Sequence, residues 1–252
     1  MDRGRGVRTA CVSLAAKTPI GEPIMKFLGF AFLVAMFSAT LAAQERFVKP
    51  ADEAKLDPSF LAFRTKLIAA AERKDVAYII SVLDPKIMAS LGGHEGVTDF
   101  KSLWKLSDKN SRFWDEFLRV MKNGGRFTGE GRNRMNLFTA PYLFSGMPDD
   151  LDMFEYYAIF GNNVNMREQP NTNAKVIEQL SYNVVKIDEP SAVKRKTGSG
   201  EDDWEYDWHK VTSLSGKSGW VKAEFVRSSI DYRAGFEKKR GVWKMTFFIA
   251  GD

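Results

Sequence analysis

The residue types that carry most enzyme chemistry are scarce in this chain. Its 252 residues include one cysteine, Cys11, and two histidines, His94 and His209. A cysteine hydrolase needs a thiolate nucleophile, and a catalytic zinc site needs about three protein ligands. The two histidines are far apart in the sequence, and His209 is expected to be exposed within a strand beside Trp208. The sequence therefore predicts no metal site, no cofactor and no nucleophilic catalyst.

One segment of the N-terminal half leaves an alternative open. His94 and Glu95 stand together in GGHEG, and Asp99 follows closely. A histidine beside a carboxylate can act as a general base, and paired carboxylates can hydrolyse glycosidic bonds. A glycine-rich turn explains the same segment without any chemistry. His94, Glu95 and Asp99 are thus the candidate residues of a small-molecule-binding or enzymatic pocket, which is the alternative to a non-catalytic function.

Aromatic residues of the C-terminal half offer a different kind of site, a surface that holds a ligand. Aromatic side chains on alternating strands are usually buried, which favours core positions for Trp208 and Trp220. The charged segment DEPSAVKRKTGSGEDDWEYD is expected to be an extended hairpin or a mobile loop, and binding modules vary in such loops. Trp204 and Tyr206 belong to its variable end and are the better surface candidates. The candidate ligand-binding residues are Tyr182, Trp204, Tyr206 and Trp208.

The N-terminal segment has the layout of a secretory signal. Met25 and Lys26 precede the apolar run FLGFAFLVAMFSATLAA, and Thr40 and Ala42 supply the small residues before a cleavage site. The run is shorter than the roughly 20 residues that a membrane-spanning helix needs. Residues 1–42 are therefore predicted to be an upstream segment and a signal peptide. The protein is expected to be exported, periplasmic or extracellular, and to meet a membrane only during export.

Loss of residues 1–42 changes what the composition implies. The full chain has a charge of +5. The lost segment holds five of the 37 basic and two of the 32 acidic residues, which leaves 32 basic and 30 acidic side chains and a charge of +2. This charge is too small to indicate nucleic-acid binding. Cys11 is lost as well, so no disulfide is expected. Residues 1–24 are either a misassigned start or a long basic region before the signal.

The chain then divides by the period of its apolar residues. Residues 57–127 are predicted to be a helix-rich domain, because Asp57 and Pro58 form a helix start and apolar residues follow at helical spacing. Within it VAYIISVL is expected to be helical and IMASL to be a strand, and Gly124-Gly125 stops the last helix. Residues 128–155 are a linker or extended segment, in which LFTAPYLF packs against the first domain.

From Tyr156 onward the period changes from that of a helix to that of a strand. Short apolar segments separated by turn residues predict an all-β half, with a barrel over residues 156–228 and a β-hairpin over residues 229–252. The overall class is therefore α+β. The barrel interior is expected to contain Val164, Met166, Val176, Ile177 and Leu180.

An ordered set of short segments in residues 164–226 resembles the bacterial SH3 domain, a small exported barrel often fused to proteins that act on cell walls or receptors. The segments are VNMR, a turn over residues 170–173, KVIEQL, VVKI, WHKV, GWV and FV. Tyr182-Asn183 replaces the family's basic residue and glycine, and the asparagine is expected to allow the turn. The resemblance implies an SH3-like barrel that binds cell-wall peptide or an envelope protein.

A second and less specific resemblance concerns the two ends of the remaining chain. The helical opening, residues 63–93, and the ending GVWKMTFFIAGD resemble the start and finish of a nuclear-transport-factor-2-like cone. The hairpin 229–252 would then complete the N-terminal domain, and the barrel would interrupt it. Glu95 and Asp99 could in that case line the mouth of the cone. A hairpin packed on the barrel is the simpler alternative.

Overall fold

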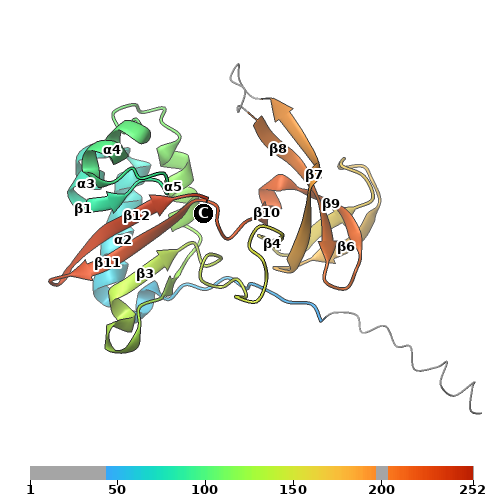
Figure 1. The fold of residues 1–252 in the computed structure, drawn as a ribbon, viewed down its shortest axis with the longest axis horizontal. Helices are drawn as coiled ribbons and strands as arrows, with labels where there is room; N and C mark the ends of the chain where they lie inside the picture. The colour runs from blue at the N-terminus through green and yellow to red at the C-terminus, as the bar shows by residue number, and fades with distance from the viewer. Residues whose placement is uncertain (1–43, 197–203, 252) are drawn as a thin grey trace, which may run out of the picture. The chain divides into compact units, whose positions relative to one another are not determined.

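The computed structural model of the protein describes residues 44–196 and 204–251. These residues belong to one compact unit that begins at Ala42, and they form an α+β fold with two β-sheets (Figure 1). The predicted α+β class is confirmed. The predicted signal peptide, Cys11 and the middle of the charged loop lie outside the described residues. In the described ranges, no helix is long and apolar enough to cross a membrane.

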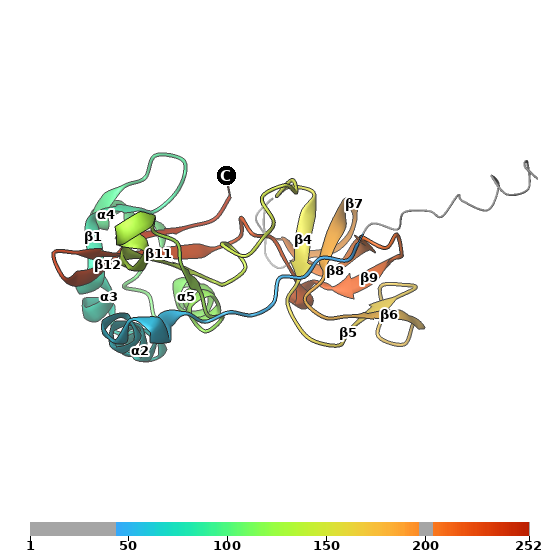
Figure 2. The same cartoon turned by 90° about the horizontal axis from the view of Figure 1, so that it is seen from below.

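The first part of the fold is a five-stranded sheet with helices packed on it, called the five-stranded part below. Its strand order is β1-β12-β11-β3-β2, with β1 parallel to β12 and the other pairs antiparallel. Helices α2 and α5 lie along one side of this sheet (Figure 2). The elements are η1 (Ala54–Leu56), α2 (Pro58–Glu72), α3 (Val76–Val82), β1 (Leu83–Met88), α4 (Gly96–Leu103), α5 (Phe113–Met121), β2 (Arg126–Phe127), η2 (Gly131–Asn136), β3 (Leu137–Ala140), β11 (Arg233–Lys239) and β12 (Val242–Ile249).

The C-terminal hairpin lies in this sheet and does not pack on the other one. Strand β11 pairs with β3 on one side and with β12 on the other, and β12 pairs with β1. The sequence left open whether the hairpin belongs to the N-terminal domain or to the barrel. The segment predicted as a linker, residues 128–155, contributes β3 to the middle of the same sheet.

Strand β1 begins earlier in the chain than the sequence indicates. The expected strand IMASL starts at Ile87, but the observed strand starts at Leu83 and includes Asp84 and Pro85. Leu83 and Ile87 are both buried, so the strand is held by its apolar side. The Asp84 carboxylate lies 2.7 Å from Lys239 Nζ, which gives the buried acid a partner. A residue pair that reads as a helix end is thus kept in a strand by tertiary contacts.

An aromatic core fills the space between the helices and this sheet. Phe60 of α2 is fully buried, and its ring centroid lies 4.2 Å from that of Phe138 and 4.7 Å from that of Trp243. Phe113 of α5 stacks on Phe117 at 5.0 Å and meets Phe248 edge-on at 5.6 Å. Such packing fills the space between these helices and the sheet with side chains.

The second part is an antiparallel sheet of seven strands, called the seven-stranded part below, and the sheet is curled. Its order is β10-β4-β7-β8-β9-β5-β6. A short helix, η3 (Ala223–Phe225), precedes β10. The strands are β4 (Tyr156–Ile159), β5 (Val164–Arg167), β6 (Val176–Leu180), β7 (Val184–Lys196), β8 (Trp204–Ser213), β9 (Ser218–Lys222) and β10 (Val226–Arg227).

The inner side of the curled sheet has its own apolar core. Val164, Met166 and Leu180 are buried there, as the alternation predicted, and Ile177 is half-buried against the same core. Val176 was expected inside as well, and this is wrong: it is 38% exposed. The β5–β6 register shifts between Met166 and Arg167, so the strict alternation is lost at the start of β6.

Candidate functional site

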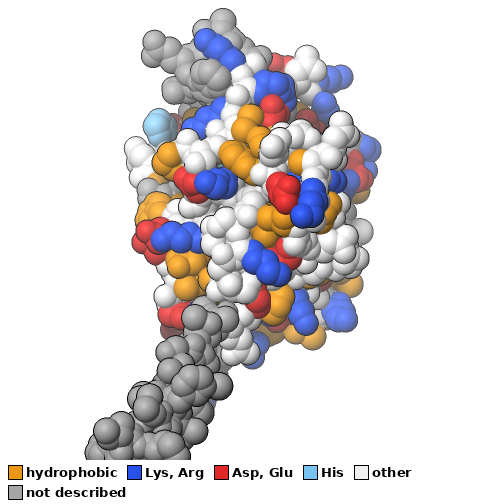
Figure 3. All heavy atoms as spheres, turned by 90° about the vertical axis from the view of Figure 1, so that its right-hand side faces the viewer, with side chains coloured by type: hydrophobic (Ala, Val, Ile, Leu, Met, Phe, Trp, Pro, Cys, Tyr) orange, Lys and Arg blue, Asp and Glu red, His pale blue; other side chains and the backbone are white. Residues whose placement is uncertain are grey.

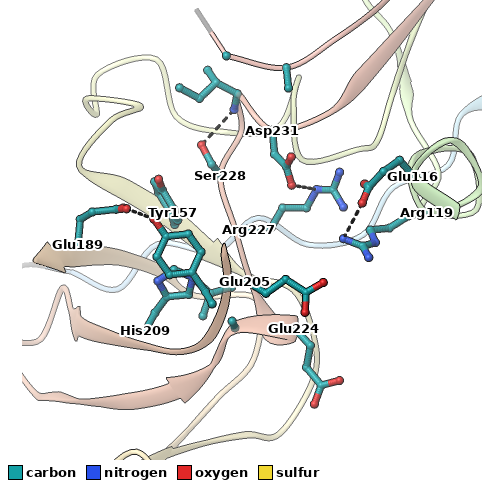
Figure 4. Close-up of a pocket in the computed structure, with 16 residues that line it drawn as sticks. Glu116, Arg119, Tyr157, Glu189, Glu205, His209, Glu224, Arg227, Ser228 and Asp231 are labelled. Carbon is teal, nitrogen blue, oxygen red and sulfur yellow. Dashed lines mark hydrogen bonds and ion pairs between the residues drawn. The ribbon is translucent and has the colours of Figure 1, made fainter. Parts of the chain in front are cut away.

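Tyr206 is the predicted site residue that the structure places most clearly at a cavity. It is 37% exposed and lines a cavity of about 720 Å³ at the seven-stranded part. Figure 4 shows the side chains around it: Tyr157 from β4, Glu189 from β7 and His209 from β8 converge on one side, and Arg227 from β10 lies across from them. Four strands therefore contribute to this group of polar and aromatic side chains.

An irregularity in β8 brings Tyr206 and His209 together. Lys194 of β7 pairs with Tyr206, and the preceding residue Val193 pairs with Trp208. Asp207 is thus an extra residue on β8, and an extra residue moves the following side chains to the opposite face. As a result the Tyr206 and His209 rings share one face, with their centroids 4.6 Å apart. The cluster depends on this bulge.

Hydrogen bonding and charge also fix the position of the Tyr206 ring. The Tyr206 hydroxyl donates a hydrogen bond to Glu189 Oε1, and Lys194 Nζ lies 4.7 Å from the ring centroid. Partial burial and the Glu189 carboxylate raise the pKa of Tyr206, so the hydroxyl stays protonated and can donate. A ring held in this way loses little conformational freedom when a ligand contacts it.

His209 was expected to be exposed, and this is wrong: it is 6% exposed. It lies on the inward face of β8, two residues before the fully buried Val211. Its Nδ1 is buried and has no hydrogen-bond partner among the described residues. Burial lowers the pKa of His209, and the nearby Glu189 carboxylate only partly opposes this. The imidazole is therefore neutral at pH 7.

A pH-dependent stability follows from the buried His209. Because its pKa is lower in the folded chain than its unfolded value of about 6.5, the unfolded chain binds the proton more readily. The free energy of unfolding should therefore fall as the pH drops from about 7.5 to 5.5, by at most about 1.4 kcal/mol, which is the limit set by proton uptake of the unfolded imidazole over this range. Urea unfolding at both pH values, compared with His209→Phe, measures this. Equal losses in the two proteins would contradict the assignment.

Arg227 closes another side of the cavity and is itself almost buried, at 6% exposed. Its Nη2 donates to the Tyr232 carbonyl oxygen at 3.0 Å, and its Nε lies 3.5 Å from Asp231 Oδ2. Glu116 and Arg119 of α5, 3.5 Å apart, form a similar pair at the same cavity (Figure 4). The two arginines at this cavity are thus neutralised within the protein.

Two further cavities continue from the first. One, of about 560 Å³, shares Tyr206 with the large cavity and is also lined by Trp208 and Thr172. The next, of about 240 Å³, shares Trp208 and Thr172 with it and extends to Phe225. Trp208 was expected in or near the core, and it is only 9% exposed, yet it lines both of these cavities. The three cavities are linked by these shared lining residues and are together called the Tyr206 depression below.

The other candidate aromatic residues are not gathered there. Tyr182 lines a separate cavity of about 430 Å³ with Tyr142 and Phe160. In the turn before β7 it is Tyr182 that adopts the left-handed conformation, with φ 61°, and not Asn183 as expected. The Asn183 side chain instead accepts a hydrogen bond from the Ser181 backbone N–H at 2.7 Å. The side chain of Trp204 lies outside the described part of the structure.

The alternative pocket residues occupy the turn between β1 and α4. His94 and Glu95 are exposed, and Asp99 is half-buried in the first turn of α4. His94 Nδ1 lies 3.0 Å from Ser90 Oγ, a contact within the turn itself. Other residues line the cavities of about 720, 600, 560, 430 and 240 Å³ in the described part of the chain. Across residues 44–196 and 204–251, no group of three or more histidine, cysteine or acidic residues is arranged to hold a metal ion.

Sequence reasoning missed three residues of the site, Tyr157, Glu189 and Arg227. Tyr157 follows another tyrosine, Tyr156, in YYAI. The two differ only in the face of β4 on which they lie, and the residue type does not reveal which face lines a site. Glu189 belongs to the charged segment expected to be an extended hairpin or a mobile loop, and the structure places it in the long strand β7, which pairs with β8. No sequence pattern joins these residues to Tyr206, because strand pairing creates their proximity.

Comparison with known proteins adds no identity to this geometry. No model of a known protein family matches the chain, and no curated protein matches it.

Proposed function

We propose that this protein is an exported, non-catalytic binding or scaffolding protein of the cell envelope. Its seven-stranded part is an SH3-like barrel that binds cell-wall peptide. An envelope protein that presents a similar extended peptide is the other partner that the barrel would bind. The barrel assignment is supported by the ordered segments from VNMR to FV and by the apolar inner side of the curled sheet. The export assignment is supported by the signal-like sequence before Gln44.

The single observation that carries the proposal is the Tyr206 depression. Its three cavities follow one another along shared aromatic residues, Tyr206 and then Trp208. A series of cavities linked by aromatic residues suits an extended chain, because aromatic surfaces can hold the side chains of a peptide. A compact substrate would need only one closed cavity.

The charges of the depression suit a ligand that carries both signs. Arg195 lies 2.8 Å from Glu205, and Lys222 lies 3.4 Å from Glu224. Exposed ion pairs of this kind contribute little to stability, so a ligand can exchange with either partner at small cost. Basic and acidic side chains are also interspersed over the face drawn in Figure 3. Cell-wall peptides carry amino and carboxylate groups, whereas a nucleic acid requires a basic surface.

The proposal predicts that Tyr206→Ala weakens binding to purified peptidoglycan at least tenfold. Loss of a half-exposed aromatic anchor typically costs about 2 kcal/mol at the centre of an interface. Co-sedimentation with peptidoglycan, and titration calorimetry with soluble cell-wall peptides at physiological salt, measure the change. Tyr206→Phe separates the ring from its hydrogen bond to Glu189 and should retain most of the affinity.

A matched control is Phe154→Ala. Phe154 is an aromatic residue that is 59% exposed and does not line the depression. Its removal should leave binding unchanged. If both alanine variants bind peptidoglycan as the unchanged protein does, the depression is not the site. If the unchanged protein binds neither peptidoglycan nor any envelope protein, the proposed function is wrong.

A further inference from the structure

The five-stranded part contains a cavity of its own, separate from the Tyr206 depression. It has a volume of about 600 Å³ and lies where α4 ends, beside the residues that flank β11 and β12. Its apolar lining comes from Leu103, Trp104, Tyr232, Ala89 and Ala250. Leu103 is 49% exposed, so apolar surface continues to the rim. A volume of this order accommodates a small organic molecule.

A buried polar group of this cavity has no partner in the protein. Trp104 is 4% exposed, and its indole Nε1 has no hydrogen-bond partner among the described residues. A buried donor without a partner costs about 1–3 kcal/mol, so such groups call for an explanation. Trp114, in contrast, donates its indole N–H to the Asp108 carbonyl oxygen at 3.2 Å. Trp104 therefore brings to the wall of the cavity a side chain whose donor no residue of the described chain satisfies.

A cation lies over the same aromatic rings. The Arg112 guanidinium carbon is 5.6 Å from the Trp104 ring centroid and 5.5 Å from the Tyr232 ring centroid. Arg112 also donates to the Tyr232 hydroxyl, which orients the guanidinium beside the cavity. Neither Arg112 nor Lys105, the second basic residue of the lining, has a carboxylate within ion-pair distance in the described part of the chain.

The single acidic residue of the lining does not cancel this charge. The Asp108 Oδ1 atom accepts a hydrogen bond from the Asn110 backbone N–H at 2.8 Å and so belongs to the turn. Two basic side chains and one acidic side chain leave the cavity with a positive charge. A planar guanidinium with free N–H groups matches a carboxylate in both charge and shape.

We propose that this cavity binds a small organic molecule with a carboxylate on a compact apolar body. Arg112 pairs with the carboxylate, and the apolar body contacts the rings of Trp104 and Tyr232 and the side chain of Leu103. The site lies outside the peptide depression, and it differs from the set His94, Glu95 and Asp99. It does not depend on the proposed peptide-binding function.

The test uses the chain from Ala43 to Asp252 and three defined probes. Phenylacetate has the charge and the apolar body, phenylacetamide has the body alone, and acetate has the charge alone. Titration calorimetry should give measurable affinity for phenylacetate, and binding at least tenfold weaker for each of the other two. Proton–nitrogen NMR should show the Trp104 indole N–H signal, assigned with Trp104→Phe, shifting as phenylacetate is added.

Variants of the basic residue separate binding from structure. Arg112→Gln should weaken phenylacetate binding at least tenfold, Arg112→Lys should restore part of it, and Arg132→Gln, an exposed change in η2, should have no effect. The unfolding midpoint of each variant shows whether it is folded. Equal affinity for phenylacetamide and phenylacetate in the unchanged protein would overturn the proposal, as would no binding of phenylacetate at millimolar concentration. Neither result depends on a variant that folds.

Discussion

Replacing Phe60 by alanine should lower the free energy of unfolding by about 3–5 kcal/mol. The Phe60 side chain is fully buried. Its ring touches the rings of residues from β2, β3, β11 and β12, with centroid distances between 4.2 Å and 5.8 Å. Neighbours held on four strands of one sheet cannot move together to fill the space, so a cavity would remain.

The expected loss is large compared with the total stability of an ordinary domain, about 5–15 kcal/mol. Urea unfolding followed by far-ultraviolet circular dichroism measures it. Leu61→Ala provides a control on the same helix, because Leu61 is 38% exposed and its replacement should change the free energy of unfolding by less than about 1 kcal/mol. A loss below about 1 kcal/mol for Phe60→Ala would contradict the packing described for this core.

The second large effect is expected at Gly125, where Gly125→Ala should cost about 3 kcal/mol or more. A Cβ atom at this position would lie 2.2 Å from the Thr139 carbonyl oxygen and 2.5 Å from the Phe138 ring. The first of these contacts is with backbone, and a strand in the middle of a sheet cannot yield to it. Gly125 also exchanges hydrogen bonds with the segment before α2: its N–H donates to Ala51 and its carbonyl accepts from Glu53.

Thermal and urea unfolding of Gly125→Ala test this expectation. Gly92→Ala is the matched control, because a Cβ there would meet only Ser90 Oγ at 3.6 Å, an ordinary contact. The control should unfold within about 0.5 kcal/mol of the unchanged protein. If the two variants have the same stability, the close approach of β3 to Gly125 is not present in solution.

The helix starts and the strand periods were readable from the sequence because they depend on neighbouring residues. Asp57 caps α2 by accepting hydrogen bonds from the backbone N–H groups of Ser59 and Phe60, as the pair Asp57-Pro58 predicted. The alternation in VNMR gave the buried positions Val164 and Met166 correctly. Both patterns depend only on residues within one turn of helix or one strand.

The parts that could not be predicted depend on contacts between distant segments. Strand β1 includes Asp84 and Pro85 because Lys239, far along the chain, pairs with the acid. Tyr206 was identified as a candidate from its position beside a charged loop. Its contact with His209 depends on the bulge at Asp207, and no residue type in this segment predicts a bulge there. The candidate site was therefore predictable in its aromatic residue but not in its geometry.

The position of β11 in the five-stranded sheet has a consequence for how the chain folds as it is made. β11 lies between β3 and β12, so the sheet stays open in the middle until residues 233–249 have emerged. All strands of the seven-stranded sheet lie between residues 156 and 227, and that sheet can close first. Until the last strands are made, the apolar faces of the first helices, including Phe60 on α2, remain uncovered. Contacts so distant in sequence form slowly, so the N-terminal half of this chain is the part most exposed to aggregation and proteolysis before folding is complete.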